Sequence, residues 1–415
     1  MKRIQLTIKA LAPLAIGRQK PGGSVSETEK YIPGTVLRGA IAAQVLQQFN
    51  RQYPNQPQDL TTESGGDFQK LFLGEKAAIF HNAYPAGDPE TDDIRVLPAT
   101  AVSSKTKAGF QPKKSGVFDT LIDRFCAEGY GLVYDPDAPG RAGERVEPYS
   151  GFYTSSTEQY TTCSAGTRML TRVGINRRRA TAEEQILYSI EVLNETATDA
   201  NSDKTRPTLF QGAVLIEDDA LAEDLKNFVE SHPFRLGGGA SRGLGKVEIR
   251  ASIQPINSQV TDRIEAFNCA LSKRWDEWKV FKVPARQGFA ATRTYFTLDI
   301  QSEAILTDQW RRTVVLSPQM LCYLTKVDDT SLQLHTAYTS YDYRSGWNSA
   351  WGLMKDVDLV TNRGGVYLFS TEQPQRWTDA LKYLELWGIG ERTVEGFGQV
   401  RVCDEFHLIF REEAK

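Results

Sequence analysis

The sequence predicts an α+β protein made of two tandem ferredoxin-like units, the first of which carries a long insertion. Three observations predict this fold. A helix, a glycine-dense loop and a strand follow one another twice, with the loops and strands at residues 236–249 and 386–402. Around each copy, apolar residues recur with the 3.6-residue period of a helix before the loop and with the two-residue period of a strand after it. The elements up to residue 250 also read strand, helix, insertion, strand, strand, helix, strand, which is the connectivity of one ferredoxin-like unit.

The first half of this unit has clear local signals. Residues 3–9 alternate between polar and apolar side chains, so we expect a strand there. A glycine- and serine-rich loop at 17–30 follows, and a helix is expected at 35–49 with Thr35 as its N-cap. Residues 51–185 show little regularity and are expected to form the insertion after this helix.

The second half is more regular. Strands are expected at 186–193 and about 209–216, and a helix that starts with Asp218 and Asp219 and ends near residue 230. The acidic start of this helix suits the helix dipole. The first glycine loop and a strand at 246–250 complete the unit.

A second unit follows, although its middle part is ambiguous. Its clearest elements are a helix at 262–278, strands at 294–300 and 365–369, and a helix at 377–387 before the second glycine loop. We therefore expect one domain at 1–255, with its insertion at about 51–185, and a second at 256–415.

Composition limits the classes of function. The 415 residues are 40% hydrophobic and 24% charged, with a net charge of −3. This balance weighs against a free-standing, salt-driven nucleic-acid binder, but it is compatible with a subunit whose basic groups are local. No run approaches the roughly 20 apolar residues of a membrane span. No signal-peptide core is present and the cysteines are scattered, so we expect a cytoplasmic protein with reduced thiols and no membrane contact.

The two glycine loops are the main candidate site. Closely spaced glycines allow positive φ and let a sugar-phosphate chain approach the backbone. Because each loop follows a helix C-terminus, the helix dipole does not help to bind anions, and side chains must supply the charge. A tight turn from helix to sheet also selects glycine, so a purely architectural role stays open. The candidate residues are Gly237, Gly238, Gly239, Ser241, Arg242, Gly243, Gly245 and Lys246 in the first loop, and Gly388, Gly390, Arg392, Gly396 and Gly398 in the second.

Basic and aromatic residues elsewhere are further candidates. Clustered arginines give sequence-independent affinity for phosphates, although a solvated strand edge would look the same. Exposed aromatic rings can stack on unpaired bases, but most aromatic side chains lie in cores. The basic candidates are Arg168, Arg172, Arg177, Arg178 and Arg179, then Arg38 beside the Gly34 turn, and Lys105 with Lys107, Lys113 and Lys114. The aromatic candidates are Tyr31, Tyr84, Tyr341, Tyr343 and Trp347.

Several of these stretches resemble the RAMP superfamily, the repeat-associated RNA-binding subunits of CRISPR effector complexes. Residues 31–40, Y-I-P-G-T-V-L-R-G-A, are similar to the start of its first helix, and both glycine loops are similar to its glycine loops. Residues 80–85, 172–177 and 343–348 are similar to the two-domain RAMP subunit of subtype III-D.

The resemblance implies an RRM-like fold and a structural role in RNA-guided antiviral defence. The chain would bind guide RNA (crRNA) at its 5′ handle, with target RNA as a further partner. It would pack against a large polymerase/cyclase-like subunit and against backbone RAMP subunits.

Catalysis is less well supported. The resemblance implies that backbone subunits of type III complexes cut target RNA with an acidic residue just before the Y-I-P-G turn. Here that loop has no aspartate, and Glu27 and Glu29 are the only acidic substitutes. His81 is a further weak candidate for a general base. No cysteine or histidine spacing suits zinc, and no Walker motif is present, so neither metal nor cofactor is expected.

We therefore expect a non-catalytic RNA-binding subunit, and two alternatives remain. One is a metal-independent endoribonuclease that matures the guide or cuts the target. The other is a protein–protein adaptor whose glycine loops are only architectural.

Overall fold

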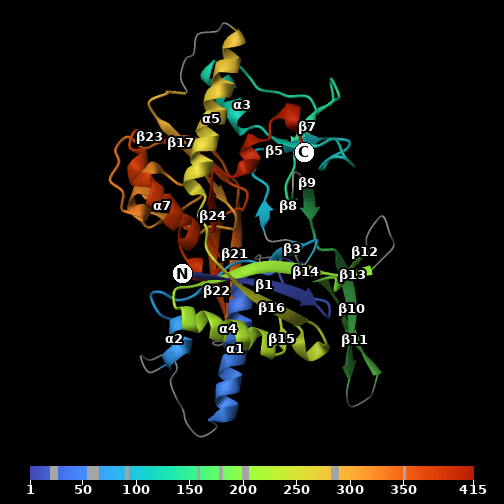
Figure 1. Ribbon diagram of the computed structural model, residues 1–415. Helices are drawn as coiled ribbons and strands as arrows, with labels where there is room; N and C mark the ends of the chain where they lie inside the picture. The colour runs from blue at the N-terminus through green and yellow to red at the C-terminus, as the bar shows by residue number, and fades with distance from the viewer. Residues whose placement is uncertain are drawn as a thin grey trace.

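A computed structural model describes residues 1–18, 27–53, 65–88, 93–156, 159–176, 181–198, 205–281, 289–348 and 352–415. It confirms the α+β class with two sheets of the same topology. In Figure 1, the first sheet lies in the lower half of the molecule with α1 and α4, and the second lies above it with α5 and α7. Within the described ranges, no helix is long and apolar enough to cross a membrane.

The first sheet is antiparallel and has the order β15-β16-β1-β14, after which both β2 and β3 pair with β14. Its buried face packs on α1 and α4 in one apolar cluster, and every residue of β14 is buried. The elements are β1 (Lys2–Ala10), α1 (Gly34–Gln52), α2 (Gly66–Phe72), β2 (Ile79–Phe80), β3 (Tyr84–Ala86), β14 (Leu209–Ile216), α4 (Asp219–Ser231), β15 (Phe234–Arg235) and β16 (Lys246–Gln254).

This topology corrects the expected place of the insertion. The second ferredoxin-like strand is formed by β2 and β3, which lie inside the stretch 51–185. The strand expected at 186–193 exists as part of β11 (Thr181–Leu193), but it pairs with β10 (Thr167–Asn176) in a separate two-stranded ribbon. A strand of two or three residues is too short to show a hydrophobic period, whereas the long ribbon shows one clearly.

The start of the first helix also differs from expectation. Pro33, and not Thr35, is the N-cap, and no side chain of the cap forms a hydrogen bond. Instead, the Gly34 N–H donates to Asn82 Oδ1 at 2.8 Å. By contrast, Asp218 caps α4 as the acidic start suggested, because its side chain accepts from two backbone N–H groups.

The second sheet repeats the first. Its order is β20-β23-β17-β24, so β24 occupies the place that β16 has in the first sheet. The ribbon β21–β22 is inserted between the second and third strands, as β10–β11 is in the first unit. The elements are α5 (Val260–Trp278), β17 (Thr294–Ile300), β18 (Leu306–Asp308), β19 (Arg311–Thr313), α6 (Pro318–Thr325), β20 (Gln333–Tyr338), β21 (Tyr341–Asn348), β22 (Leu353–Thr361), β23 (Val366–Thr371), α7 (Pro374–Trp387) and β24 (Val400–Val402).

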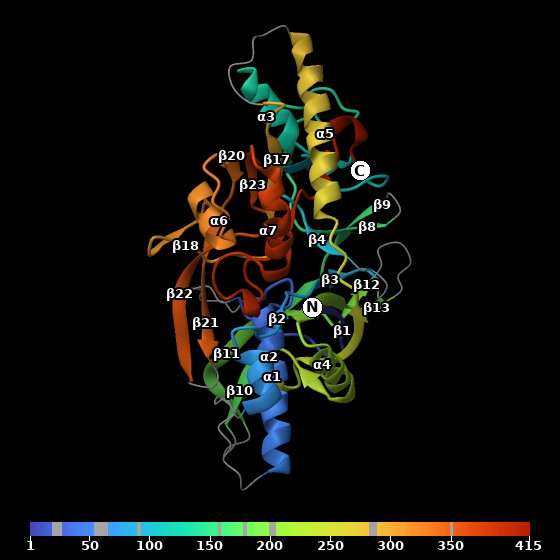
Figure 2. The same ribbon diagram turned by 60° about the vertical axis from the view of Figure 1, so that its left-hand side comes forward.

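The rest of the first insertion packs on the second unit. Phe125 of α3 (Leu121–Gly129) and Tyr130, which follows that helix, belong to the same buried cluster as Trp275 and Tyr295. Figures 1 and 2 both show α3 beside α5. The insertion therefore braces the second core, and the expected domain division at residue 255 stays a prediction. Its elements are β4 (Ile94–Val96), β5 (Ala101–Ser104), β6 (Val117–Asp119), α3 (Leu121–Gly129), β7 (Val146–Pro148), β8 (Phe152–Ser156), β9 (Gln159–Cys163), β12 (Thr196–Thr198) and β13 (Thr205–Pro207).

Candidate nucleic-acid interface

The two glycine loops have the same backbone. In each loop, the N–H of the first residue donates to the carbonyl oxygen of a residue at the end of the loop. Two further N–H groups of the loop donate to carbonyl oxygens of the segment that follows the first strand of the sheet. The matching bonds are Leu236 N–H to Gly245 O and Ile389 N–H to Gly398 O, Gly238 N–H to Ala15 O and Glu391 N–H to Ile305 O, and Gly245 N–H to Pro13 O and Gly398 N–H to Glu303 O. The repeat is therefore structural as well as sequential.

Four of the glycines are required by this backbone. Each has positive φ, and a Cβ atom would collide with a carbonyl oxygen of the same unit. The colliding pairs are Gly237 with Ala15, Gly390 with Ile305, Gly245 with Leu236, and Gly398 with Ile389. At these positions the architectural explanation of glycine is sufficient.

A third matched pair separates the loops. Gly243 is exposed, and a Cβ atom there would meet nothing within 4 Å. Its counterpart Gly396 is buried, with the position of a Cβ only 2.7 Å from Phe80 O and 2.9 Å from Asn82 Oδ1. The first loop is thus open to solvent, whereas the second is covered by the first unit.

Charged residues follow the same division. Backbone bonding makes Arg392 the counterpart of Gly239, and Glu395 the counterpart of Arg242. The Arg392 guanidinium pairs with Asp358 at 3.1 Å and with Glu395 at 2.7 Å. Burial disfavours the charge of Glu395, but Arg392 and Lys355 outweigh it and hold the pKa of Glu395 below its usual value. The charge of the second loop is therefore neutralised internally.

The first loop keeps its cations at the surface. Arg242 is exposed, donates to the Tyr188 hydroxyl at 2.8 Å and lies over the ring of Tyr188. Tyr188 faces Arg172 across the β10–β11 ribbon. Lys246 is exposed and forms no ion pair with any residue that the structure describes. Arg242 and Arg172 thus both neighbour Tyr188, and the exposed Arg242 and Lys246 lie on either side of Gly243 along the chain.

Other candidates have different surroundings. Arg168 pairs with Glu195 at 2.7 Å, and Lys105 pairs with Glu147 at 2.7 Å. Arg38 donates to Phe72 O, and burial lowers the pKa of its guanidinium. Gly34 is packed against Phe80 O, as a helix start at the seam between the units. None of these four lies at the open loop, and Arg177, Arg178 and Arg179 lie outside the described residues.

The aromatic candidates divide in the same way. Tyr31 and Tyr84 are buried, and the Tyr84 hydroxyl donates to Gln301 O at 2.6 Å. Tyr341 and Tyr343 are exposed on β21. The side chain of Trp347 lies outside the described part of the chain.

The acidic candidates for catalysis are both engaged. Glu29 is buried and forms an ion pair with Arg344, which also pairs with Glu303. Glu27 is more exposed and lies 3.4 Å from Arg18. Neither carboxylate is positioned as a free general base.

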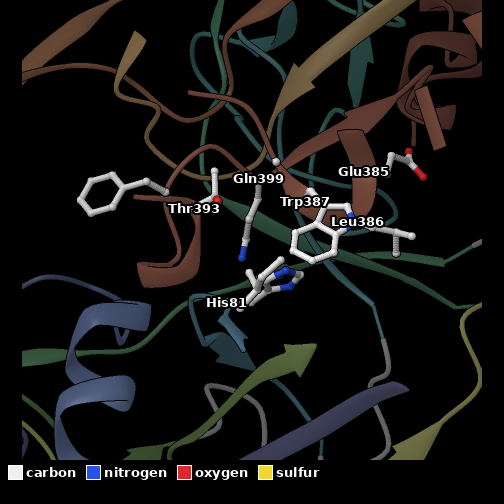
Figure 3. Close-up of a pocket in the computed structure, with 9 residues that line it drawn as sticks. His81, Glu385, Leu386, Trp387, Thr393 and Gln399 are labelled. Carbon is white, nitrogen blue, oxygen red and sulfur yellow. The ribbon is translucent and has the colours of Figure 1, made fainter. Parts of the chain in front are cut away.

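His81 lies in a small hollow at the seam between the units. Figure 3 shows its ring below Trp387, with the Gln399 amide pointing toward it. Burial lowers the pKa of His81 to about 3, and the charge of Arg3 contributes in the same direction. The imidazole is therefore neutral at pH 7, and neither Glu27 nor Glu29 lines this hollow.

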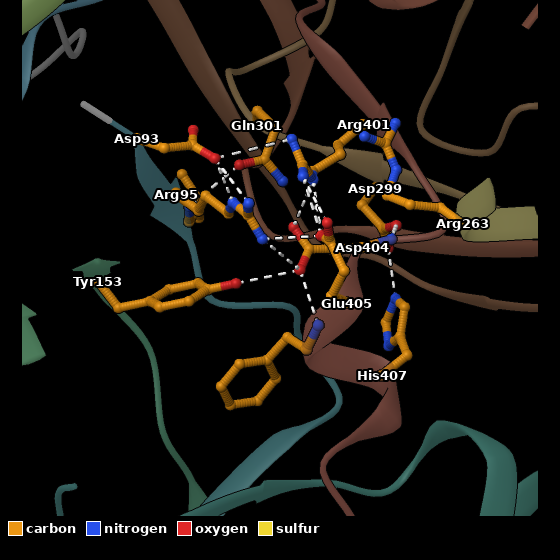
Figure 4. A network of polar contacts seen from close by, with 12 residues as sticks. Asp93, Arg95, Tyr153, Arg263, Asp299, Gln301, Arg401, Asp404, Glu405 and His407 are labelled. Atoms are coloured by element: carbon orange, nitrogen blue, oxygen red, sulfur yellow. Dashed lines mark hydrogen bonds and ion pairs between the residues drawn. The ribbon is translucent and has the colours of Figure 1, made fainter. Parts of the chain in front are cut away.

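A buried ionic network joins the insertion to the second unit (Figure 4). His407 Nε2 lies 2.8 Å from Asp299 on β17, and Nδ1 lies 3.3 Å from Asp119 on β6. Burial disfavours the imidazolium, but the two carboxylates outweigh it and raise the pKa of His407 well above its usual value. In the described ranges no group of three or more histidine, cysteine or acidic residues has a metal-binding arrangement, so this network is best explained as a brace.

Sequence reasoning noted that Glu391 and Glu395 dilute the charge of the second loop, but it missed Tyr188 and the pairing of Arg392 with Asp358. The spacing of the glycines held one useful signal, because Gly237, Gly243 and Gly245 match Gly390, Gly396 and Gly398. That alignment places Arg242 opposite Glu395 and Lys246 opposite Gln399. It would have shown that only the first loop keeps its positive charge.

Comparisons with known proteins give one family match and several similar solved structures. The RAMP superfamily pattern matches residues 7–248, which is more than half of the chain. No curated protein matches. Among solved structures, the chain is similar to one in the type III-B Cmr-beta complex bound to cognate target RNA, with 10% identity, 92% of this chain and 88% of that chain covered, and a TM-score of 0.35. A chain of the same complex in the apo state gives 13% identity, 60% and 96% coverage, and a TM-score of 0.28. From the superfamily match, the chain belongs to the RAMP superfamily.

Proposed function

We propose that this chain is a non-catalytic subunit of a CRISPR type III effector complex, of subtype III-D, that holds the 5′ handle of the guide RNA. The observation that carries the proposal is the open first glycine loop, with the exposed Arg242 and Lys246 in the loop and at its end, and with Arg242 bonded to Tyr188, which faces Arg172. The stretches that resemble subtype III-D support the finer assignment.

The chemistry of this loop suits a ribonucleotide chain. Because Gly243 has no side chain and the space beside its Cα atom is open, a ribose-phosphate can approach the peptide groups of the loop closely. The two arginines and the lysine supply charge to phosphates without reading sequence. Tyr188 holds the Arg242 guanidinium by a hydrogen bond and by its ring, so part of the ordering cost is met before RNA binds.

The endoribonuclease alternative has less support. Glu29 is held by Arg344, and the neutral His81 lines a hollow that neither acidic candidate lines. The adaptor alternative describes the second loop well, since that loop is covered and internally neutralised. We propose that the two loops have diverged, with RNA at the first and architecture at the second.

In the assembled complex we propose a cytoplasmic location and contacts with a large polymerase/cyclase-like subunit and backbone RAMP subunits. The domains would be 1–255 and 256–415, with the insertion of the first bracing the second. Target RNA would meet this chain only through the guide.

The test is binding of a guide RNA with and without its 5′ handle to Arg242→Ala/Lys246→Ala. We expect at least about tenfold weaker binding of the handle-bearing RNA, and a salt dependence reduced by about 1.4 in logarithmic slope for two lost phosphate contacts. The matched control is Arg250→Ala. Arg250 is an exposed arginine on β16, the strand that also carries Lys246, and it pairs with Glu248. Unchanged binding by the double variant, or equal loss in the control, would contradict the proposal.

A further inference from the structure

The two inserted ribbons, β10–β11 and β21–β22, are equivalent in position but differ in surface. Their registers begin alike, with Thr167 opposite Leu193 and Tyr341 opposite Thr361. If Thr167 and Tyr341 are taken as equivalent first positions, Arg168 of the first ribbon is at the same position as Asp342 of the second. A shared scaffold with different side chains indicates different partners.

The inner face of β21–β22 is saturated with ion pairs. Arg344 pairs with Glu29 and Glu303, and Asp358 pairs with Arg312 and Arg392. Arg344 and Asp358 lie opposite each other in the register, so they share this face. The ribbon is therefore fixed firmly to the body of the molecule on one side.

The outer face is apolar and uncovered. Tyr341 and Tyr343 alternate with Arg344 along β21, and Val357 lies one residue before Asp358, so these three point away from the ion pairs. They are 59%, 48% and 53% exposed, and the two tyrosine rings contact edge to face at 6.2 Å. Leu353 and Met354 of β22 are also exposed, but as consecutive residues they point to opposite faces of the ribbon, so only one of them extends this surface. Side chains of this size rarely gather on a free surface without a partner.

The charge of the ribbon favours a protein over RNA. Asp356 and Val357 together lie opposite Ser345, at the register shift between the Arg344–Asp358 and Gly346–Lys355 pairs. Asp356 is exposed and forms no ion pair with any described residue. The described cations of the ribbon are engaged, Arg344 with two glutamates and Lys355 with Glu395. A phosphodiester chain would meet an acidic group and no free cation on this ribbon. A second copy of the same face would add another acidic group and no free cation to a two-fold interface, so it would not supply a partner for Asp356.

We infer that the outer face of β21–β22 docks another protein subunit, through a surface that is apolar at its centre and carries lysine or arginine at its rim. Tyr341, Tyr343 and Val357 supply the apolar contact, and Asp356 selects the basic rim. This inference rests on the proposed role as a subunit of a complex, but not on RNA binding at the first loop.

The test uses the chain co-expressed with the other subunits of its complex. In Tyr341→Ser/Tyr343→Ser/Val357→Thr, we expect at least a tenfold loss of co-purifying subunits, while guide-RNA binding by the isolated chain stays within twofold of wild type. The matched control is Tyr323→Ser/Val133→Thr, which changes two other highly exposed apolar side chains and should assemble normally. Equal melting temperatures of all forms exclude a folding defect as the cause.

A charge reversal separates the occupants. Asp356→Lys should weaken assembly several-fold, with a larger effect at low salt, because the basic rim is then repelled. Stronger RNA binding by this variant with assembly intact would instead identify RNA as the occupant and overturn the inference. Normal assembly by the triple variant, a dimer of the isolated wild-type chain that the triple variant abolishes, or a wild-type chain that brings no subunit with it would also overturn it.

The outcomes distinguish this inference from the proposed RNA function. Loss of RNA by Arg242→Ala/Lys246→Ala with assembly intact would support RNA binding at the first loop and leave the ribbon unaffected. Loss of assembly by the triple variant with RNA retained would support docking alone.

Discussion

The two glycine loops share a backbone but have opposite surroundings. The first is open at Gly243 and carries the exposed Arg242 and Lys246, whereas the second is covered at Gly396 by the first unit, and its Arg392 is paired with Glu395 and Asp358. Glycine therefore serves two purposes in one motif. Some glycines are required for the loop to fold, and one leaves a free approach to the backbone. The difference shows that the motif alone does not identify a binding site, because the neighbours of the loop decide its role.

The largest expected effect on stability concerns the buried ion pairs of His407, which join the insertion to the second unit. In His407→Gln, Asp119 and Asp299 lose the buried cation that joins the insertion to the second sheet, and the free energy of unfolding should fall by about 3–5 kcal/mol. Urea denaturation measures this loss. His232→Gln is the control, because His232 lies just after α4 and its contacts are local, with Phe228 O, the Ser231 hydroxyl and the Phe228 ring. A loss below about 1 kcal/mol would show that the brace is not needed.

The pH dependence gives this prediction a sign. The pKa of His407 is raised in the folded state, so its contribution is fully present below the unfolded value of about 6.5 and declines as pH rises through the folded pKa. The stability difference between wild type and His407→Gln should therefore be largest near pH 6 and shrink in more alkaline solution. A difference that grows with pH would contradict the assignment of an imidazolium.

The next effect compares the open and covered glycines directly. Both Gly396→Ala and Gly243→Ala place a side chain at positive φ, which costs about 1–2 kcal/mol. At Gly396 the new Cβ also meets Phe80 O at 2.7 Å, so overpacking should add about 1–3 kcal/mol. Denaturation of the two variants measures the difference.

RNA binding should show the reverse order. Gly243→Ala fills space that we assign to the ribose-phosphate chain, so affinity for the guide should fall although the protein remains folded. Gly396→Ala should keep its affinity under conditions where it is folded. Equal effects on RNA in both variants would remove the distinction between the loops.

Replacing a single arginine in each loop tests the same difference between the two loops, with smaller expected effects. Arg392→Ala leaves Asp358 and Glu395 with fewer partners and should lower stability by about 1–2 kcal/mol with no change in guide affinity. Arg242→Ala should do the opposite, with stability within about 0.5 kcal/mol and affinity reduced about five- to tenfold. Melting curves and RNA titrations on both proteins provide the measurements.

The sequence predicted the regular parts of the fold because they have long periodic signals. The strand at 294–300 is confirmed without a shift, and the helices expected at 262–278 and 377–387 are confirmed to within three residues. The short strands β2 and β3, which together form the second strand of the first sheet, were missed, since no period can be read from two or three residues. That one omission misplaced the insertion, because it left 186–193 as the only visible partner for the first sheet.

The site was predictable only in part, for a physical reason. The positions of the glycines are local features, and the sequence contains them in full. Which loop is covered depends on Phe80 and Asn82, which are more than 300 residues from Gly396 in the chain. The pairing of Arg392 with Asp358 likewise depends on how the β21–β22 ribbon folds back. Contacts of this kind follow from tertiary packing and leave no periodic trace.

The smallest predicted effect tests why Arg242 is effective and Arg392 is not. Tyr188→Phe keeps the ring beneath Arg242 but removes the hydroxyl that accepts from its guanidinium at 2.8 Å. The loss of that exposed hydrogen bond should leave stability within about 0.5 kcal/mol and weaken guide binding about two- to threefold, because Arg242 then loses order in the free protein. Tyr188→Phe in an Arg242→Ala background should have no further effect if the tyrosine acts through the arginine. An additive loss in that double variant would mean that Tyr188 contacts the RNA itself, and the open loop would then extend onto the ribbon.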